Sequence, residues 1–320
     1  MNDKVILSAS IGFIAGLFGA LLIRGCGKAL LDMPNGRSSH SVPTPRGGGI
    51  GIVIGFVIVS AFIVNDFTGA AIGAGIGVLG VLEDRFGLPI GLRLALQLMG
   101  ALTAVLIAGA SATTALFWAV VTAGTANFYN FLDGIDGIAG LTGAVSFSLL
   151  AFFSFFIAGN ASIGALSTAL AAGCIGFLPL NFPRAKVFMG DAGSIFLGFE
   201  FALSTHSLAD SLKSLLCLGM FLCVFYADAL VTLFYRWRNG EDLASPHRGH
   251  LYQYLCNGLG YSHRTVSELY AAVQLLFGVL AILAYYRSVV WQAAVIIAFS
   301  ASFIIAYRSI KGLDPLGQIY

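Results

Sequence analysis

Long apolar stretches separated by short polar segments run through the whole chain. A helix that spans a membrane needs about 20 apolar residues, and these stretches are continuous rather than alternating, unlike the strands of a membrane barrel. The pattern therefore predicts an all-α, polytopic bundle of about eleven transmembrane helices, with about ten as the alternative count. The predicted spans are residues 5–23, 47–64, 68–82, 90–109, 112–131, 138–157, 161–180, 190–206, 212–235, 265–286 and 289–307.

The composition supports a membrane protein. Apolar residues make up 58% of the chain and charged residues 10%, whereas a soluble domain carries about 25% charged residues. The chain is predicted to be a single integral membrane domain over residues 1–320. The net charge of +2 gives no support to a nucleic-acid partner. The five cysteines contain no C-x-x-C pair, which indicates packed thiols rather than a metal or disulfide role.

The distribution of Lys and Arg predicts the orientation. An odd number of spans places the termini on opposite sides, and we expect the N-terminus outside and the C-terminus in the cytoplasm. Only Lys4, Lys213 and Arg287 of the 17 Lys and Arg residues then fall outside, in agreement with the positive-inside rule. The polar motifs also fall on the cytoplasmic side, at the ends of spans. A channel or carrier would place such groups near the midplane.

The first polar motif is the loop 24–46, which ends in a run of three glycines at residues 47–49. Glycine lets the backbone approach closely as a helix begins. Arg37, His40 and Arg46 could hold phosphate, although an ordinary basic loop would have the same composition.

The second motif begins the loop 83–89 with Glu83 and Asp84. Adjacent carboxylates at a membrane surface repel each other, and a neighbouring cation or Mg²⁺ relieves the repulsion. The alternative is a solvated helix end.

The third motif, residues 127–140, repeats a polar residue at every third position: Asn127, Asn130, Asp133 and Asp136. This spacing places the four side chains along one side of a helix. Acids and amides between apolar spans are costly unless they bind something, and their oxygens suit a hard cation. The alternative is a polar network whose members satisfy one another.

The fourth motif, residues 181–194, places Asp191 after Gly190 where a span begins. Free backbone amides at the start of that helix could hold phosphate, and the acid could hold a metal bridging the same phosphate. A plain helix cap is the alternative.

The fifth motif, in the loop 236–264, brings together His247, Arg248 and His250 without a nearby cysteine. This favours an anion clamp over zinc, with surface basic charge as the alternative. Two acids inside spans, Glu200 and Asp228, are interpreted as facing the bundle interior and pairing with polar neighbours.

Taken together and in this order, the five segments resemble the polyprenyl-phosphate N-acetylhexosamine-1-phosphate transferases of glycosyltransferase family 4. These bacterial enzymes start O-antigen, enterobacterial common antigen and peptidoglycan lipid intermediates. The sharpest runs are N-x-x-N-F-x-D-G-x-D-G-x-A at 127–139 and F-M-G-D-x-G-S at 188–194. The H-R-x-H-L-Y-Q stretch at 247–253, followed by G-Y-S-H at 260–263, is similar to the O-antigen and common-antigen branch.

The resemblance implies an enzyme of the bacterial inner membrane, active on its cytoplasmic face and plausible as a homodimer. It would transfer N-acetylhexosamine-1-phosphate from a UDP-sugar to undecaprenyl phosphate and release UMP, with Mg²⁺ as cofactor or Mn²⁺ in its place. Which sugar is used (GlcNAc, GalNAc, FucNAc or QuiNAc) stays open.

The resemblance also carries residue roles over by matching motif. Catalytic roles fall on Glu83, Asp84, Asp133 and Asp191, with Asp84 as a hypothetical base. Metal ligation falls on Asp191 and Asn130. Substrate binding falls on Asn130, Asp136, Asn181, Phe188, His247, Arg248 and His250, and Arg46 is expected to join them. Glu83 departs from the family's usual Asp-Asp pair, which puts in doubt any role that needs exact placement of that carboxylate.

Three other classes fit less well. A CDP-alcohol phosphotransferase would continue its D-G motif with Ala-Arg and two later aspartates, but Ala139 is followed by Gly140. An intramembrane aspartyl protease needs G-x-G-D inside a span, and Phe188 stands where the first glycine would be. A transporter would need polar sites near the midplane, which are sparse here.

Overall fold

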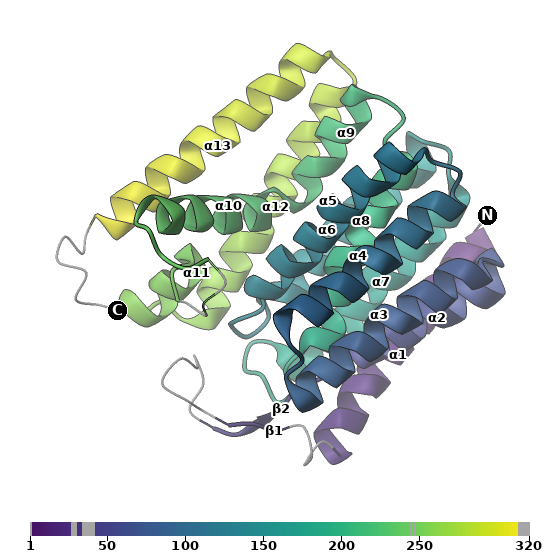
Figure 1. Ribbon diagram of the computed structural model, residues 1–320, viewed down its shortest axis with the longest axis horizontal. Helices are drawn as coiled ribbons and strands as arrows, with labels where there is room; N and C mark the ends of the chain where they lie inside the picture. Colours follow the sequence, from purple (N-terminus) through teal and green to yellow (C-terminus); the bar gives the residue numbers. More distant parts are fainter. Residues whose placement is uncertain (1, 27–30, 34–41, 244, 246–247, 313–320) are drawn as a thin grey trace.

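The computed structural model describes residues 2–26, 31–33, 42–243, 245 and 248–312. The chain folds into a bundle of long helices (Figure 1). The elements in chain order are α1 (Asn2–Cys26), β1 (Leu31–Asp32), β2 (Thr44–Pro45), α2 (Ile50–Val59), a π-helical turn (Ser60–Val64), α3 (Phe67–Phe86), α4 (Ile90–Ile107), α5 (Ala112–Phe131), α6 (Ile138–Phe156), α7 (Ala161–Asn181), α8 (Asp191–Leu208), α9 (Leu212–Gly219), a 3₁₀ turn (Met220–Leu222), α10 (Cys223–Arg238), α11 (Leu251–Gln253), a π-helical turn (Tyr254–Gly258), α12 (His263–Tyr285) and α13 (Val289–Lys311).

Every predicted span coincides with a helix or a helical run. Within the described residues, 8 helices are long and apolar enough to cross a membrane, so the protein is a multi-pass α-helical membrane protein. The predicted spans 47–64, 112–131 and 190–206 are helical but are not among those 8. The count of eleven therefore stays a prediction, as does the orientation of the termini.

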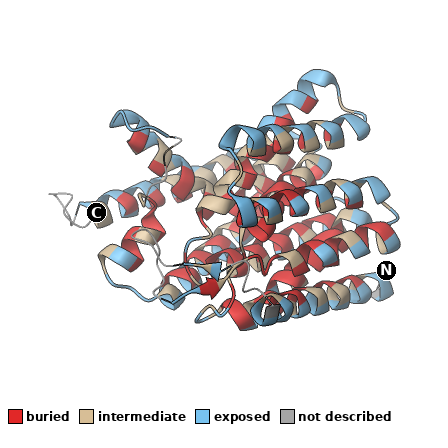
Figure 2. Ribbon diagram, turned by 60° about the horizontal axis from the view of Figure 1, so that its bottom comes forward, coloured by how far each residue is buried: buried red, intermediate tan, exposed pale blue. Residues whose placement is uncertain are grey.

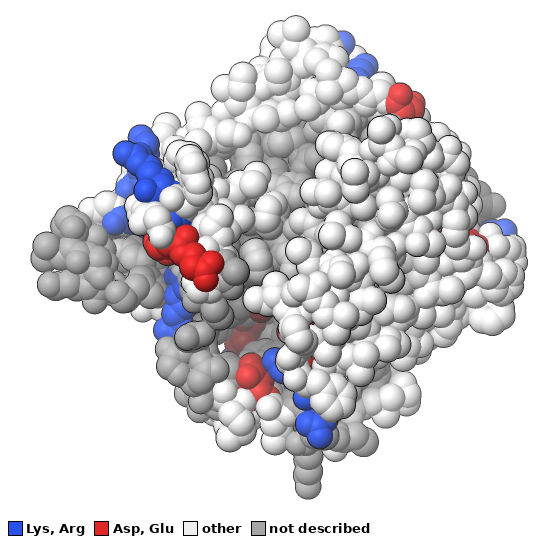
Figure 3. Space-filling view, viewed as in Figure 1, with Lys and Arg blue, Asp and Glu red and all other residues white. Residues whose placement is uncertain are grey.

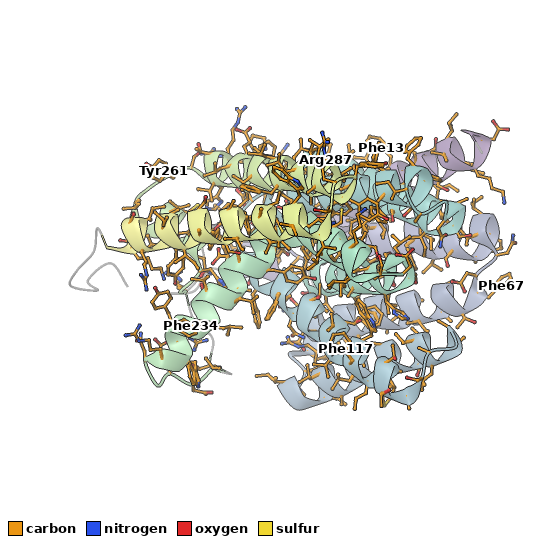
Figure 4. All side chains as sticks on the ribbon, turned by 90° about the horizontal axis from the view of Figure 1, so that it is seen from above. Phe13, Phe67, Phe117, Phe234, Tyr261 and Arg287 are labelled. Atoms are coloured by element: carbon orange, nitrogen blue, oxygen red, sulfur yellow. The ribbon has the colours of Figure 1, made fainter. Side chains whose placement is uncertain are left out.

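The outer surface of the bundle is apolar. Large side chains such as Phe13, Phe67, Phe117 and Phe234 stand on its periphery (Figure 4), and Phe67 is 66% exposed. The buried positions face inward between the helices (Figure 2). Aqueous solvent would penalise so much exposed hydrocarbon, and lipid would not.

Small residues bring the first helix close to α7. A Cβ atom added to Gly12 would lie 2.1 Å from the carbonyl oxygen of Ala169, and one added to Gly16 would lie 2.2 Å from that of Gly173. Backbones that approach this closely are typical of helix pairs in membranes. The hydrophobic effect does not drive association there, and close packing at small residues does.

One of the 8 membrane-length segments, Leu212–Arg238, is not a single regular helix. Residues 212–235 form α9 and α10 rather than one straight helix, and α10 runs in a different direction from α9 (Figure 1). Gln274 of α12 compensates for the break, because its side chain donates to the Met220 carbonyl (2.9 Å) and accepts from the Val224 amide (3.1 Å).

A two-residue antiparallel ladder departs from the all-α expectation. Leu31 pairs with Pro45 and Asp32 pairs with Thr44. The ladder lies in the connection between α1 and α2, and Pro45 also accepts a hydrogen bond from the Phe188 amide (2.8 Å). The connection before α2 is thereby attached to the segment before α8.

Candidate active site

The acidic and basic motifs meet at one end of the bundle, where α3 and α5 end and α4 and α8 begin. Charged side chains lie mainly along the left side and the bottom of the space-filling view, whereas most of the remaining face is uncharged (Figure 3). Segments far apart in sequence thus form one polar cluster, which we call the acidic cluster: Glu83, Asp84, Arg93, Asn130 and Asp191.

The start of α8 is fixed by backbone pairing with the glycine run. The Gly48 amide donates to Phe188 and the Gly49 amide to Met189, both at 2.9 Å. A Cβ atom on Gly49 would lie 2.4 Å from the Cα of Gly193. The expected close approach of the glycine run to another backbone segment is confirmed. These contacts hold the segment that carries Asp191 in place.

Asp191 is the first residue of α8 and points its carboxylate at two other elements. Its Oδ1 accepts from the Asn130 side-chain amide at 3.0 Å, and its Oδ2 lies 3.6 Å from the Arg93 guanidinium. The Asn130 amide also donates to the Ser194 hydroxyl, one turn along α8 (2.9 Å). The end of α5 and the start of α8 are therefore joined through these polar groups.

Asp84 is buried beneath Asp191, with 1% of its side chain exposed. Its Oδ1 accepts from the Asp191 amide (3.1 Å) and its Oδ2 from the Ala192 amide (3.2 Å). Arg46 lies 3.5 Å from the carboxylate and also donates to the Asp84 carbonyl. The expectation that the α8 amides hold phosphate is wrong for these two amides, because the carboxylate of Asp84 already occupies them.

Arg93 is a site residue that the sequence analysis missed. Its guanidinium lies 3.3 Å from Glu83 and donates to the Asn127 side chain at 3.4 Å, in addition to its contact with Asp191. Only 14% of its side chain is exposed. A cation inside the first turn of a predicted span is unusual in itself, and this signal could have identified it.

Glu83 uses both carboxylate oxygens. One pairs with Arg93, and the other accepts from the Leu88 amide at 2.7 Å. Glu83 therefore supports the loop after α3 and holds Arg93, whereas its neighbour Asp84 faces α8.

Asp133 lies in the connection after α5, partly buried near the acidic cluster. Its carboxylate makes no hydrogen bond or ion pair with another described residue. Burial, and then the negative charges of Asp191 and Asp84, raise the pKa of Asp133 well above its usual range. An acid in such surroundings is stabilised in its charged form when a cation approaches.

A second group of predicted residues surrounds the connection 132–137. Asp136 lies 3.3 Å from the His263 imidazole, and its carbonyl accepts from Ser267 (2.8 Å). Asn181 accepts from the Gly137 amide (2.9 Å) and donates to the Val187 carbonyl (3.0 Å). Asn181 is buried and connects two of the predicted loops. Phe188 is partly buried beside them.

His250 occupies a third environment, inside the protein. Its ring lies 3.3 Å from Asp228, which also accepts from the Leu251 amide (2.9 Å) and the Tyr270 hydroxyl (2.7 Å). The interpretation of Asp228 as an interior acid with polar partners is confirmed. Tyr252 connects this group to the acidic cluster's side of the bundle, because its hydroxyl donates to the Phe131 carbonyl (3.0 Å) at the end of α5.

The remaining predicted residues are placed as follows. Arg248 lines a cavity of about 670 Å³ between α10 and α13, together with Lys311. His247, Arg37 and His40 lie outside the described residues.

The donor set fits a hard divalent cation bound together with a substrate. Among the described residues, no group of three or more His, Cys, Asp and Glu side chains could hold a metal ion. Mg²⁺ in phosphoryl-transfer sites commonly takes one or two protein ligands and completes its shell with substrate phosphates and water. The carboxylate of Asp191 and the side-chain amide of Asn130 would be the one or two protein ligands that such a site needs.

Replacing Gly190 with Ala is expected to disrupt the acidic cluster. Gly190 has φ +74°, and an added Cβ atom would lie 2.5 Å from Oδ2 of Asp84. The strained backbone costs about 1–3 kcal/mol, and the carboxylate must also move. The activity that the motifs predict, measured in micelles, should fall at least about 100-fold, as for the loss of one positioning hydrogen bond in a preorganised site.

Gly109→Ala is the matched control for this variant. Gly109 also has a positive φ (+86°), but nothing lies within 4 Å of an added Cβ atom. It should lose a similar amount of stability and keep its activity. Equal activity in the two variants would contradict the proposed importance of the contact between Gly190 and Asp84.

The fold and the cluster define a class: a multi-pass helical membrane protein with carboxylate, amide and guanidinium groups gathered at one end of its helices. Residues 67–209 match the model of glycosyl transferase family 4. A Bacillus subtilis (strain 168) protein named "Probable undecaprenyl-phosphate N-acetylglucosaminyl 1-phosphate transferase" is 26% identical over 98% of this chain and 95% of its own length. The Escherichia coli O157:H7 undecaprenyl-phosphate alpha-N-acetylglucosaminyl 1-phosphate transferase is 25% identical over 88% of this chain and 84% of its own.

A third relative has a decaprenyl-phosphate substrate in its name. The decaprenyl-phosphate N-acetylglucosaminephosphotransferase of Mycobacterium tuberculosis (strain CDC 1551 / Oshkosh) is 28% identical over 73% of this chain and 70% of its own. These similarities agree with the resemblance to the polyprenyl-phosphate N-acetylhexosamine-1-phosphate transferases that the motifs indicate.

Proposed function

We propose that this protein transfers N-acetylhexosamine-1-phosphate from a UDP-sugar to undecaprenyl phosphate, giving undecaprenyl-diphosphate-sugar and UMP. The observation that carries the proposal is the acidic cluster, in which Asp191 and Asn130 stand ready for a cation beside Arg93 at one end of an apolar bundle. Water-soluble and lipid substrates can meet only at such an end. The names of the relatives support the same reaction class.

The reaction needs two anions to approach each other. An oxygen of the lipid phosphate attacks the β-phosphorus of the nucleotide sugar, the new P–O bond forms there, and the bond from the β-phosphorus to the oxygen of the α-phosphate breaks, so that UMP leaves with that oxygen. Bound Mg²⁺, with Mn²⁺ as a substitute, would neutralise phosphate charge. Arg93 provides a fixed positive charge in the same place, and the rigid pairing of the α8 segment orients the groups.

The geometry favours a positioning role for Asp84 over the role of a base. Its carboxylate is buried and already accepts two backbone hydrogen bonds, and a lipid phosphate is ionised at neutral pH without help. Asp84 would thus hold the start of α8, and with it Asp191, in place. Asp133 has no comparable contacts and remains available to the substrates.

The nucleotide is proposed to bind beside the connection 132–137. Asn181 binds the Gly137 amide there, next to Asp136, and His263 approaches Asp136. Phe188 directly follows Val187, whose carbonyl accepts from Asn181. Arg248, with His247, would contact the diphosphate or the sugar. Because His250 is buried against Asp228, its part in this contact is to shape the loop that carries Arg248.

Asp136→Asn should raise the KM for the UDP-sugar about 10- to 100-fold while changing kcat less. The variant removes a charge-assisted partner worth about 1.5–3 kcal/mol, and each 1.4 kcal/mol corresponds to a tenfold change in affinity. Steady-state UMP release at saturating undecaprenyl phosphate measures both constants. Asp3→Asn, an exposed position at the opposite end of α1, is the control. A fall in kcat with an unchanged KM would contradict the assignment.

The proposal places the cluster on the cytoplasmic face of a bacterial inner membrane. The basic side chains at the same end, including Arg24, Arg184 and Lys186, agree with the positive-inside rule. The product would begin an O-antigen or another envelope polysaccharide. We also propose a homodimer, and the mass of the protein in micelles tests this.

The direct test uses purified protein with undecaprenyl phosphate and UDP-GlcNAc, UDP-GalNAc, UDP-FucNAc or UDP-QuiNAc, each with and without Mg²⁺. UMP release and a lipid diphosphate sugar of matching mass, both lost in EDTA, are expected for at least one donor. If folded, metal-replete protein releases no UMP from any donor and binds none of them, the proposal is wrong.

A further inference from the structure

A second polar cavity lies at the opposite end of the bundle from the acidic cluster. It has a volume of about 250 Å³ and lies among α2, α3, α4, α7 and α8. Its polar lining comes from Asp66, Thr68, Glu200, Ser204, His206 and Ser207. The remaining lining is apolar, so the cavity combines a hydrocarbon wall with a small number of polar groups, which is typical of a ligand site.

Glu200 is the deepest charged group of this cavity. It lies nine residues along α8 from Asp191, about 14 Å along the helix axis, and is 6% exposed. Its carboxyl makes no hydrogen bond or ion pair with any described residue. The interpretation that Glu200 pairs with a polar neighbour is therefore wrong, because the polar side chains that share the cavity, such as Asp66 and Ser204, form no hydrogen bond or ion pair with its carboxyl.

An unpaired carboxylate in such surroundings is costly. Burial of an isolated ionised carboxyl is opposed by several kcal/mol even after relaxation, so the group must either keep a proton or receive a cation. Asp66 contributes a second carboxylate, held at the start of α3 by the Gly69 amide (2.8 Å). None of the lining residues is Lys or Arg, and His206 is the one base among them, so the lining contains no permanently charged cation.

The chemistry of the lining selects the kind of cation. The polar lining consists of two carboxylates, one imidazole and three hydroxyls, and most of these groups can accept a hydrogen bond from a cation that carries N–H donors. The hydroxyls of Thr68, Ser204 and Ser207 can accept hydrogen bonds, and a primary ammonium has three donors to offer. The cavity is also large enough for more than an ion, since a water molecule occupies about 30 Å³.

We propose that this cavity binds a primary ammonium group, with Glu200 as its principal counter-ion. The ammonium group can come from an amine-bearing phospholipid head group or from a small soluble amine, because both present the same chemistry. The site is separate from the acidic cluster and does not depend on the transferase reaction. A ligand bound in this cavity would stabilise the end of the bundle that lies opposite the acidic cluster.

Thermal unfolding of the full chain in micelles tests the proposal. Ethanolammonium chloride is titrated against tetramethylammonium chloride, which has the same charge and ionic strength but no N–H donors. A ligand that binds the folded state raises Tm in proportion to the logarithm of its concentration above Kd. We expect a saturable rise in Tm with ethanolammonium only. No ethanolammonium-specific rise would overturn the proposal.

Variants locate the binding to the cavity. Glu200→Gln keeps the shape and removes the charge, so it should abolish the rise in Tm, and Asp66→Asn should weaken it. Glu268→Gln is the matched control, because Glu268 is an exposed residue of α12 that pairs with Arg264. It should respond as the wild type does. An equal rise in the Glu200→Gln protein would also overturn the proposal.

Mass spectrometry of protein extracted from membranes that contain phosphatidylethanolamine separates the two sources. Retention of this lipid by the wild type and its loss in Glu200→Gln would assign the cavity to a lipid head group. Stabilisation by ethanolammonium without retained lipid would assign it to a soluble amine.

Discussion

Asp191→Asn is expected to lower kcat at least about 1,000-fold, the scale on which phosphoryl-transfer enzymes depend on groups that neutralise transition-state charge. The substitution is nearly isosteric and keeps an acceptor for the Asn130 amide, which now donates to Oδ1 at 3.0 Å. What it removes is the negative charge that would hold a divalent cation against the substrate diphosphate. The KM for the nucleotide sugar should change less than kcat.

The measurement is UMP release by purified protein over a range of Mg²⁺ concentrations. Tm, compared with that of the wild type, verifies folding, and Asp3→Asn serves as the control for a lost carboxylate at the other end of the bundle. Turnover within about tenfold of the wild type would show that Asp191 does not carry the cation, and the account of the acidic cluster would fail with it.

Arg93→Ala is expected to lower kcat/KM by about 100- to 1,000-fold, the range found when one preorganised stabilising group is removed. Arg93 is the cation that lies between Glu83 (3.3 Å) and Asp191 (3.6 Å). Without it, the two carboxylates lose their shared counter-ion and the substrate phosphates lose a fixed positive charge. Arg93→Lys keeps the charge but not the planar, forked geometry, so it should recover part of the activity.

Arg287→Ala is the control for this series, since Arg287 is exposed on the outside of the bundle (Figure 4). It should have wild-type activity. If Arg93→Ala loses stability but its remaining folded fraction turns over normally, Arg93 has only a structural role. Equal activity of Arg93→Ala and Arg93→Lys would show that its charge is irrelevant.

The helical segments could be predicted well from the sequence because lipid imposes a simple rule. Each span must satisfy its backbone internally and expose apolar side chains, so continuous apolar runs identify helices directly. The break between α9 and α10 was not predictable in this way. Met220 and Val224 leave the regular ladder only because Gln274, about 50 positions later in the chain, supplies the missing hydrogen bonds.

The acidic cluster was predicted in part. The motifs identified Asp84, Asn130 and Asp191, because polar residues are conspicuous at the ends of apolar runs. Arg93 was missed because it stands inside such a run, and its partners come from three other segments. The use of the α8 amides by Asp84 depends on a tertiary contact across more than 100 residues, which no local pattern encodes.

Glu200 also shows that a sequence pattern does not reveal tertiary partners. Its position in a span predicted an interior carboxyl correctly, but a pattern of residues does not show whether a partner is within reach. The answer depends on how the side chains of α2 and α3 are placed relative to α8, and the polar one on α3 in this cavity, Thr68, forms no hydrogen bond with the carboxyl.

The most direct test of the central claim follows the β-phosphorus of the donor. Purified protein is incubated with undecaprenyl phosphate and a UDP-N-acetylhexosamine labelled with ³²P at the β-position, and the lipid and aqueous products are separated. Transfer of a sugar-1-phosphate predicts the label in the lipid fraction and unlabelled UMP in water. Label that leaves in UDP, with a sugar on the lipid, would mean that the sugar alone is transferred and would contradict the account.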